Sequence, residues 1–170
     1  MKDNLTVWIL FSLLSFVAIT TSLNSVYTQE NATDSEQPKF FAIQHANSGS
    51  ITEINATAYS LELNDVSNKT ILFSDRPDRI VKSMTTSDFI GNWSTGQNSF
   101  AVDAPNAVLV VDSNKDKQDT AILEVFNPVY DSNKKALKYE VTPNNATSID
   151  LPKEFGQTTL IIDKKPKSML

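Results

Sequence analysis

Tyr59-Ser60-Leu61-Glu62-Leu63 is the stretch of sequence that decides the fold. Large apolar side chains alternate in it with polar ones, so one face of the extended chain is apolar and the other is polar. This alternation is typical of a strand that covers a core on one side and meets water on the other. The stretch therefore predicts a half-buried β-strand and an all-β protein.

Similar short runs, separated by polar turns, continue along the chain on both sides of this stretch. Three of the turns contain Ser-Asn-Lys, in which Asn lets the backbone reverse without glycine. Such a series is typical of a sandwich or barrel, and we predict an antiparallel β-sandwich of about eight strands. The runs lie at 40–44, 51–54, 59–63, 70–74, 80–84, 107–111, 120–126, 137–141 and 158–162.

One short helix is expected after the fifth of these runs. Thr86 or Ser87 can cap its N-terminus, because a hydroxyl oxygen accepts a hydrogen bond from a free N–H of the first turn. Phe89, Ile90 and Trp93 then share one face at helical spacing. We expect Trp93 to anchor this helix in the core, with a sugar-stacking role as the alternative.

The N-terminus has the pattern of an export signal. Lys2 precedes an apolar run from Leu5 to Ile19, which is shorter than the roughly 20 residues that span a bilayer. We predict a signal peptide over residues 1–28, with an uncleaved membrane anchor as the alternative. The remaining chain is then extracellular or at the cell surface.

The rest of the chain predicts one domain. Residues 29–39 are poor in large apolar groups and indicate a flexible spacer, residues 40–163 indicate a single β-sandwich domain, and residues 164–170 form a basic tail. The chain has no Cys, so a packed core rather than disulfides must stabilise it. Its net charge of −5 argues against nucleic acid as a partner, and contact with a membrane is expected only through the N-terminal segment.

Both Arg residues of the chain lie in one pentapeptide, Asp75-Arg76-Pro77-Asp78-Arg79. A guanidinium group is a planar fork that binds a carboxylate or phosphate through two hydrogen bonds. One interpretation is a structural clasp, in which Asp75 and Asp78 pair with an Arg or accept backbone N–H groups. The other is a binding site for an anionic ligand, such as a uronate, formed by Asp75, Arg76, Asp78 and Arg79.

The same stretch resembles part of a known protein family. The shared features are Phe73-Ser-Asp-Arg-Pro-Asp-Arg-Ile80, then Phe89, Trp93 and Phe100, and then Pro105-Asn-Ala-Val-Leu109. They are similar to a family of small exported prokaryotic proteins of uncharacterised function, over about residues 49–163. The resemblance implies secretion and a single compact domain, and it implies no reaction, cofactor or catalytic residue.

A weaker pattern suggests a metal site. Asp112, Asn114 and Asp116 place oxygen atoms at alternate positions, the spacing of a Ca²⁺-binding loop. However, Lys117 and Leu123 stand where an EF-hand loop has Gly and a bidentate Glu. We therefore favour a solvated hairpin tip, with weak Ca²⁺ binding as the alternative.

Glycosylation is also predicted at the surface if the host glycosylates exported proteins. An Asn-X-Ser/Thr sequon marks an exposed turn or strand edge in such a protein. The sequons beyond the predicted signal begin at Asn31, Asn55, Asn68, Asn92 and Asn145.

Catalytic patterns are poor. His45 is the only His, and Gly91 to Gly96 has one residue too many for the nucleophile elbow of a serine hydrolase. The chain also lacks Cys ligands for zinc and a glycine-rich loop for phosphates. We predict no catalytic residue, and no cofactor beyond the weak Ca²⁺ alternative.

These patterns favour a binding or structural module of the cell envelope without catalytic activity, whose partner is a protein or polysaccharide at the cell surface. One alternative is a hydrolase that acts on an extracellular anionic polymer, with acidic residues as acid and base and Arg76 or Arg79 orienting the substrate. The other is an envelope module stabilised by Ca²⁺.

Overall fold

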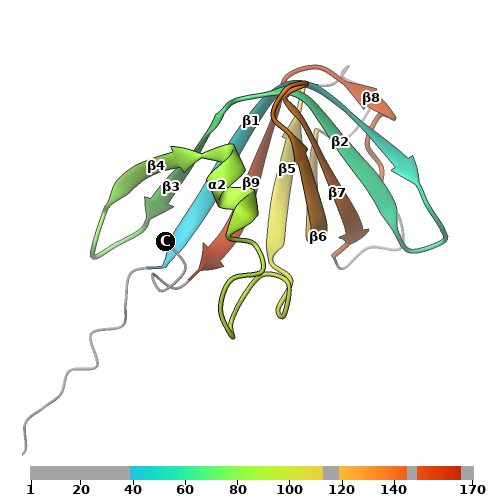
Figure 1. The fold of residues 1–170 in the computed structure, drawn as a ribbon. Coiled ribbons are helices and arrows are strands. Elements are labelled where there is room, and N and C mark those ends of the chain that lie inside the picture. Colours follow the sequence, from blue (N-terminus) through green and yellow to red (C-terminus); the bar gives the residue numbers. More distant parts are fainter. Residues whose placement is uncertain (1–38, 113–118, 145–148, 166–170) are drawn as a thin grey trace, which may run out of the picture. The chain divides into compact units, whose positions relative to one another are not determined.

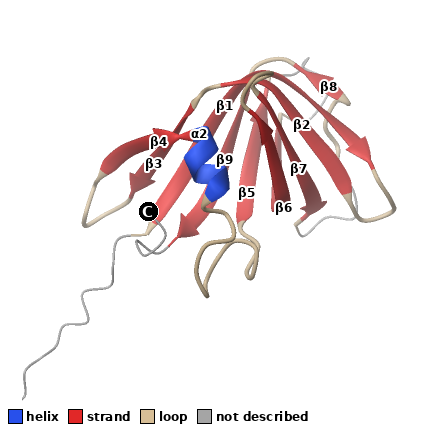
Figure 2. Cartoon of the chain, in the orientation of Figure 1, coloured by secondary structure: helices blue, strands red, loops and turns tan. Residues whose placement is uncertain are grey.

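The computed structural model describes residues 39–112, 119–144 and 149–165, which form an all-β unit with one short helix (Figures 1 and 2). The predicted signal segment lies outside the described residues. In the described part of the chain, no helix is long and apolar enough to cross a membrane. The strands are β1 (Phe40–Glu53), β2 (Tyr59–Val66), β3 (Lys69–Ser74), β4 (Val81–Thr85), β5 (Asn106–Val111), β6 (Thr120–Asp131), β7 (Ala136–Pro143), β8 (Glu154–Phe155) and β9 (Thr158–Lys165), and the helix is α2 (Thr86–Gly91).

All nine strands belong to one antiparallel sheet. Its order is β2-β7-β6-β5-β9-β1-β3-β4, with β8 beside β1. Because β1 also pairs with β2, six strands (β1, β2, β7, β6, β5 and β9) close into a ring, and the β3–β4 hairpin extends outward from β1. The sequence predicted two separate sheets. In the structure, a single sheet curves back on itself, and its inner face encloses the core.

The long strand β1 makes this closure geometrically feasible. Residues 46–53 pair with β2, whereas residues 40–43 pair with β3 along the same edge. The sequence predicted two separate strands here, 40–44 and 51–54, with a polar turn between them. That prediction was wrong, since the 14-residue strand is paired along both edges and needs no turn.

Gly49 permits a close approach between β1 and its neighbours. A Cβ atom at this position would collide with the Phe155 ring of β8 and lie 2.8 Å from the Glu62 carbonyl oxygen of β2. Any larger residue would therefore push two neighbouring segments away from β1.

The helix begins one residue earlier than the predicted caps allow. Thr85 is its N-cap, and the Thr85 hydroxyl accepts the N–H of Asp88 at 3.0 Å. The prediction of Thr86 or Ser87 was wrong because the Thr86 hydroxyl is buried and donates instead to the Ser67 carbonyl at 2.8 Å. Trp93 lies just beyond the end of the helix.

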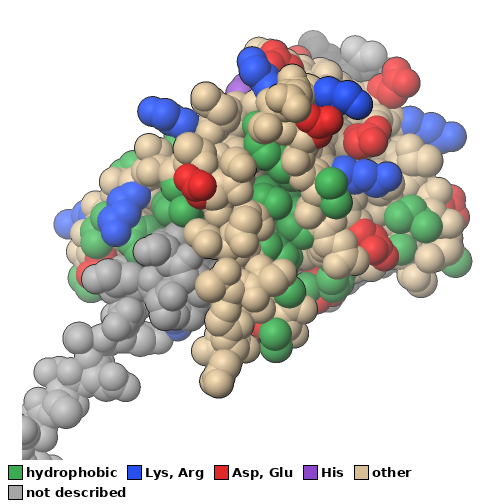
Figure 3. Space-filling model, in the orientation of Figure 1, with side chains coloured by type: hydrophobic (Ala, Val, Ile, Leu, Met, Phe, Trp, Pro, Cys, Tyr) green, Lys and Arg blue, Asp and Glu red, His purple; other side chains and the backbone are tan. Residues whose placement is uncertain are grey.

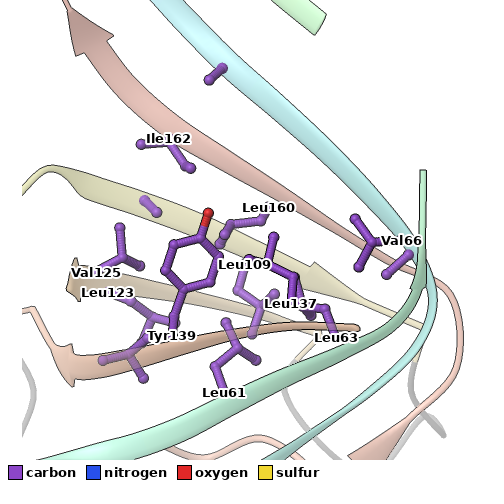
Figure 4. Packing of buried hydrophobic residues seen from close by; sticks show 14 of the residues in the cluster. Leu61, Leu63, Val66, Leu109, Leu123, Val125, Leu137, Tyr139, Leu160 and Ile162 are labelled. Atoms are coloured by element: carbon purple, nitrogen blue, oxygen red, sulfur yellow. The ribbon is translucent and has the colours of Figure 1, made fainter. Parts of the chain in front are cut away.

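The core fills the inside of the ring (Figure 4). Leu61 of the fold-deciding stretch has no exposed surface and Leu63 is 1% exposed, as the alternation predicts. Leu109, Leu137 and Leu160 converge on them from β5, β7 and β9. Residues from α2 and the loop after it, namely Phe89, Trp93 and Phe100, belong to the same cluster.

Candidate functional site

The β3–β4 hairpin carries the Arg-containing pentapeptide at its tip. Asp75 Oδ1 accepts the N–H of Arg76 at 2.7 Å, and the Asp75 carbonyl accepts the N–H of Arg79 at 3.0 Å. At the base of the turn, Ser74 Oγ accepts the N–H of Ile80 at 2.8 Å. Arg79 has a φ of 48°, in the left-handed region. These local bonds fix the backbone from which both Arg side chains project.

Arg76 and Arg79 are both exposed. Within residues 39–112, 119–144 and 149–165, neither guanidinium group has a hydrogen bond or an ion pair. One contact of the clasp interpretation is present, because the Asp75 carboxylate accepts a backbone N–H. The described residues contain no Asp–Arg ion pair at the hairpin tip. Among the described residues, no acceptor therefore occupies the guanidinium donors.

Large apolar side chains form a continuous row on the outer face of the sheet. Directly opposed residues of antiparallel strands point to the same face, so the register defines which side chains adjoin. We name this set the outer row. It consists of Ile71 (β3), Ile43 (β1), Ile161 (β9), Val108 (β5) and Ile122 (β6). Ile71 and Ile122 are 45% and 55% exposed, so a substantial part of the row faces solvent.

A shorter set of apolar residues connects this face to the hairpin tip. Phe73 of β3 is opposite Phe41 of β1 on one side and opposite Val81 of β4 on the other. Phe73 is 38% exposed and Val81 is 67% exposed. The hairpin tip that carries Arg76 and Arg79 therefore lies at the end of an apolar surface. Protein-binding surfaces are enriched in this combination of Arg, aromatic and apolar side chains.

The inner face of the hairpin is held by a buried chain of polar side chains. Tyr139 donates its hydroxyl proton to Gln44 Oε1 at 2.9 Å, and Gln44 Nε2 donates to Thr70 Oγ1 at 3.4 Å. The hydroxyl oxygens of Thr70 and Thr86 are 3.1 Å apart, and Thr86 donates to the Ser67 carbonyl. No buried side-chain nitrogen or oxygen of the described residues lacks a partner. This series of hydrogen bonds connects β3 and α2 to the ring.

The Tyr139 hydroxyl stays protonated and donates the first hydrogen bond of this series of buried side chains. Burial raises its pKa far above the ordinary value of a tyrosine, and the hydrogen bond to Gln44 opposes this effect only in part. Its ring centroid lies 5.7 Å from that of Trp93, which in turn lies 4.7 Å from Phe100. Trp93 is 4% exposed, which confirms the predicted core role.

The predicted metal site lies mostly outside the described residues, because Asn114 and Asp116 fall in the gap between residues 112 and 119. Asp112 is described and exposed, and its N–H donates to the Gln157 carbonyl at 2.8 Å. In the described ranges, no group of three His, Cys, Asp or Glu residues could hold a metal ion. His45 lies on the outer face of β1, with Nδ1 3.4 Å from Thr159 Oγ1.

Three of the predicted glycosylation sites can be located. Asn55 and Asn68 are exposed, and Asn92 is partly buried at the C-cap of α2. Asn55 Oδ1 accepts N–H groups of the turn between β1 and β2. Asn31 and Asn145 lie outside the described residues.

The sequence patterns did not predict the outer row. In β3, small polar Thr70 and Ser74 are buried with Leu72, whereas Ile71 and Phe73 face outward. The sequence does carry a signal, because β3, β5 and β9 have large apolar residues at consecutive positions. Such runs indicate strands that are apolar on both faces.

Comparison of the sequence with protein-family models and with curated proteins gave no match, and comparison of the structure with solved structures gave none either. The functional interpretation of this all-β protein therefore depends on the hairpin and its surface.

Proposed function

We propose that this protein is an exported, non-catalytic binding module of the cell envelope that binds an acidic segment of a protein at the cell surface. The observation that carries the proposal is the pair of exposed guanidinium groups of Arg76 and Arg79, which are unpaired among the described residues, at the tip of the hairpin that also exposes Phe73 and Val81. The export pattern at the N-terminus supplies the location.

The chemistry of the surface indicates what it binds. Each guanidinium group can hold one carboxylate through two parallel hydrogen bonds, which Lys cannot do. Phe73 and Val81 offer an adjacent apolar contact that excludes water from such bonds. A protein segment that alternates Glu or Asp with large apolar residues satisfies both requirements. A uronate polymer satisfies only the first, so we favour a protein.

Charge distribution supports directional contacts rather than a broad electrostatic field. On the face drawn in Figure 3, Lys and Arg side chains are interspersed with Asp and Glu, and the loop that projects below α2 is largely uncharged. No single-sign patch dominates this face. Recognition would then depend on the geometry of a few Arg contacts.

The attachment of the hairpin also favours binding. Thr70 of β3 is fixed through Gln44 to Tyr139 of β7, so the base of the hairpin is tied to the rigid ring. A surface whose support is already ordered loses less conformational entropy when it binds. The predicted hydrolase and Ca²⁺-stabilised module stay predictions from the sequence.

The test is a binding titration of the full-length chain with two probes, a synthetic peptide of alternating Glu and Leu and polygalacturonate. We expect the peptide to bind. A double variant, Arg76→Lys with Arg79→Lys, keeps both charges but loses both forks, and it should weaken peptide binding by about tenfold or more. Lys138→Gln, which removes an exposed positive charge from β7, is the matched control and should bind like the wild type.

Three outcomes would overturn the proposal. The peptide fails to bind, the double Lys variant binds it as well as the wild type does, or polygalacturonate binds more tightly than the peptide. In the last case, Phe73→Ala should leave binding of the polysaccharide unchanged, and the ligand would be an anionic polysaccharide instead.

A further inference from the structure

We infer that β4 is a dimerisation edge, through which two copies of this chain pair as antiparallel strands about a two-fold axis at Ser83. β4 ends the strand order and pairs only with β3. Among the described strands of more than two residues, it is the only one that has a single paired neighbour. Figure 2 shows no strand along its outer side.

The hydrogen bonds of the hairpin define which groups of β4 are free. The N–H of Ser74 donates to the Ile80 carbonyl, and the N–H of Thr86 donates to the Asn68 carbonyl, each at 2.9 Å. In an antiparallel pair, bonded and non-bonded positions alternate. The backbone N–H and C=O groups of Lys82 and Met84 therefore bond to β3. The other β4 residues direct their backbone N–H and C=O groups away from β3.

The outward groups belong to Val81, Ser83 and Thr85, and they are complementary to their own two-fold image. With Ser83 opposite Ser83 of the second copy, Val81 lies opposite Thr85 at both ends. The N–H and C=O groups of the two Ser83 residues then bond to each other, and the Val81 carbonyl of one copy accepts the Thr85 N–H of the other. The Thr85 carbonyl already accepts the first N–H of its own helix α2. The resulting Val–Thr pairs are β-branched on both sides, which is a favourable cross-strand combination.

The charges of β4 favour the same register. Lys82 of one copy lies opposite Met84 of the other, so no like charges face each other. The N-terminal end of each β4, near Arg79, also lies alongside the start of α2 in the other copy, near Asp88. Arg79 and Asp88 are both exposed, and their opposite charges occur twice by symmetry.

This two-fold pairing predicts a closed dimer rather than an open filament of copies. A two-fold interface uses the same edge of both chains and leaves no free β4 edge for a third. The two hairpin tips then point toward opposite ends of the joined sheet. Arg76 of each copy stays accessible, so the inference goes beyond the proposed function and does not depend on it.

The first test is sedimentation of the full-length chain over a range of concentrations. Ser83→Pro removes an outward N–H at the centre of the interface, which β3 does not use, and it should weaken the dimer by about tenfold or more. Ser83→Ala keeps this N–H and is the matched control, with a wild-type dissociation constant expected.

The second test changes the charge opposite Lys82. Met84→Glu places an opposite charge there twice, and Met84→Lys places a like charge there twice. The dissociation constant should fall in the first variant and rise in the second, each by roughly two- to thirtyfold. Both variants lose the same half-buried Met84 side chain, so a general loss of stability cannot produce opposite shifts.

The inference is overturned if the wild-type chain stays monomeric up to about 1 mM, if Ser83→Pro dimerises like the wild type, or if the two Met84 variants shift in the same direction. Peptide binding by Ser83→Pro separates the two proposals, because this variant retains Arg76, Arg79 and Phe73. Loss of the dimer with intact peptide binding would leave the proposed function standing.

Discussion

β7 and β4 belong to the same sheet, yet β7 has fully buried side chains and β4 has none. β7 pairs with β2 on one side and β6 on the other, and its Leu137, Tyr139 and Val141 have no exposed surface. Among the described strands, β4 pairs only with β3, and none of its residues is buried. The difference shows that closure of the ring, more than the apolar content of a strand, decides what is buried.

The two regions consequently differ in how much apolar surface they bury. The ring supplies the stability of the protein, because its inner face contains most of the buried apolar surface. The hairpin leaves apolar surface exposed, because its outer side chains have no covering layer in the described residues. The buried chain from Tyr139 to Thr86 connects the two regions.

The largest effect is expected when one apolar residue is truncated in each region. Leu61→Ala in the ring should lower the free energy of unfolding by about 2–5 kcal/mol, because it leaves a cavity in a fully enclosed site. Val81→Ala in β4 should change it by less than about 0.5 kcal/mol. Urea denaturation of both variants measures the difference. Equal losses would show that the hairpin carries as much stability as the ring.

A smaller effect is expected from the glycine inside the ring. Gly49→Ala should cost about 1–3 kcal/mol, because the added methyl group collides with Phe155 and the Glu62 backbone. Gly91→Ala is the control in α2, where nothing lies within 4 Å of an added Cβ. It should be neutral or stabilise by up to about 1 kcal/mol. The unfolding temperature should therefore fall in Gly49→Ala and stay unchanged or rise in Gly91→Ala, and an equal fall in both variants would contradict the close-packed strand β1.

Tyr139→Phe tests the connection between the regions. It leaves Gln44 Oε1 without its donor, and we expect a loss of about 1–3 kcal/mol near neutral pH. Relative to Tyr139→Phe, the wild type should lose additional stability as the pH rises above about 10, where the unfolded state releases the phenol proton of Tyr139. Because burial raises the pKa of Tyr139 in the folded state, the folded chain keeps that proton, and the loss is about 1.4 kcal/mol per pH unit.

The measurement is denaturant unfolding of both proteins at a series of pH values from 7 to about 11. The difference in free energy between wild type and Tyr139→Phe should shrink above pH 10. A constant difference across this range would show that Tyr139 does not titrate on unfolding, contrary to its burial.

The smallest effect is expected at the junction of β4 and α2. Thr85→Ala removes the hydroxyl that accepts the N–H of Asp88, and it should cost about 1 kcal/mol. Thr85→Ser keeps an equivalent oxygen and should remain close to the wild type. Calorimetry that found a loss in the Ser variant equal to that in the Ala variant would assign the effect to packing of the methyl group instead of capping.

Part of this structure can be predicted from the sequence. Short apolar and alternating runs predicted strands around residues 59–63 and 107–111, and helical spacing predicted a helix that includes Trp93. The helix is real but shorter, because it ends at Gly91. The concentration of both Arg residues between Asp75 and Arg79 singled out the hairpin tip. The break predicted between residues 44 and 51 was wrong, because a polar stretch gives the same local signal in a turn and in a strand paired along both edges.

By itself, the sequence determined that the chain is extended, that residues such as Leu61 face a core, and that both guanidinium groups share one turn. These properties are local, because they depend on the two-residue period of a strand and on neighbours along the chain. Only the tertiary structure decided that one sheet closes into a ring, and that Ile43 lies beside Ile161 on an outer apolar surface. Strands that are apolar on both faces can be buried on either, and the pairing of distant segments makes that choice.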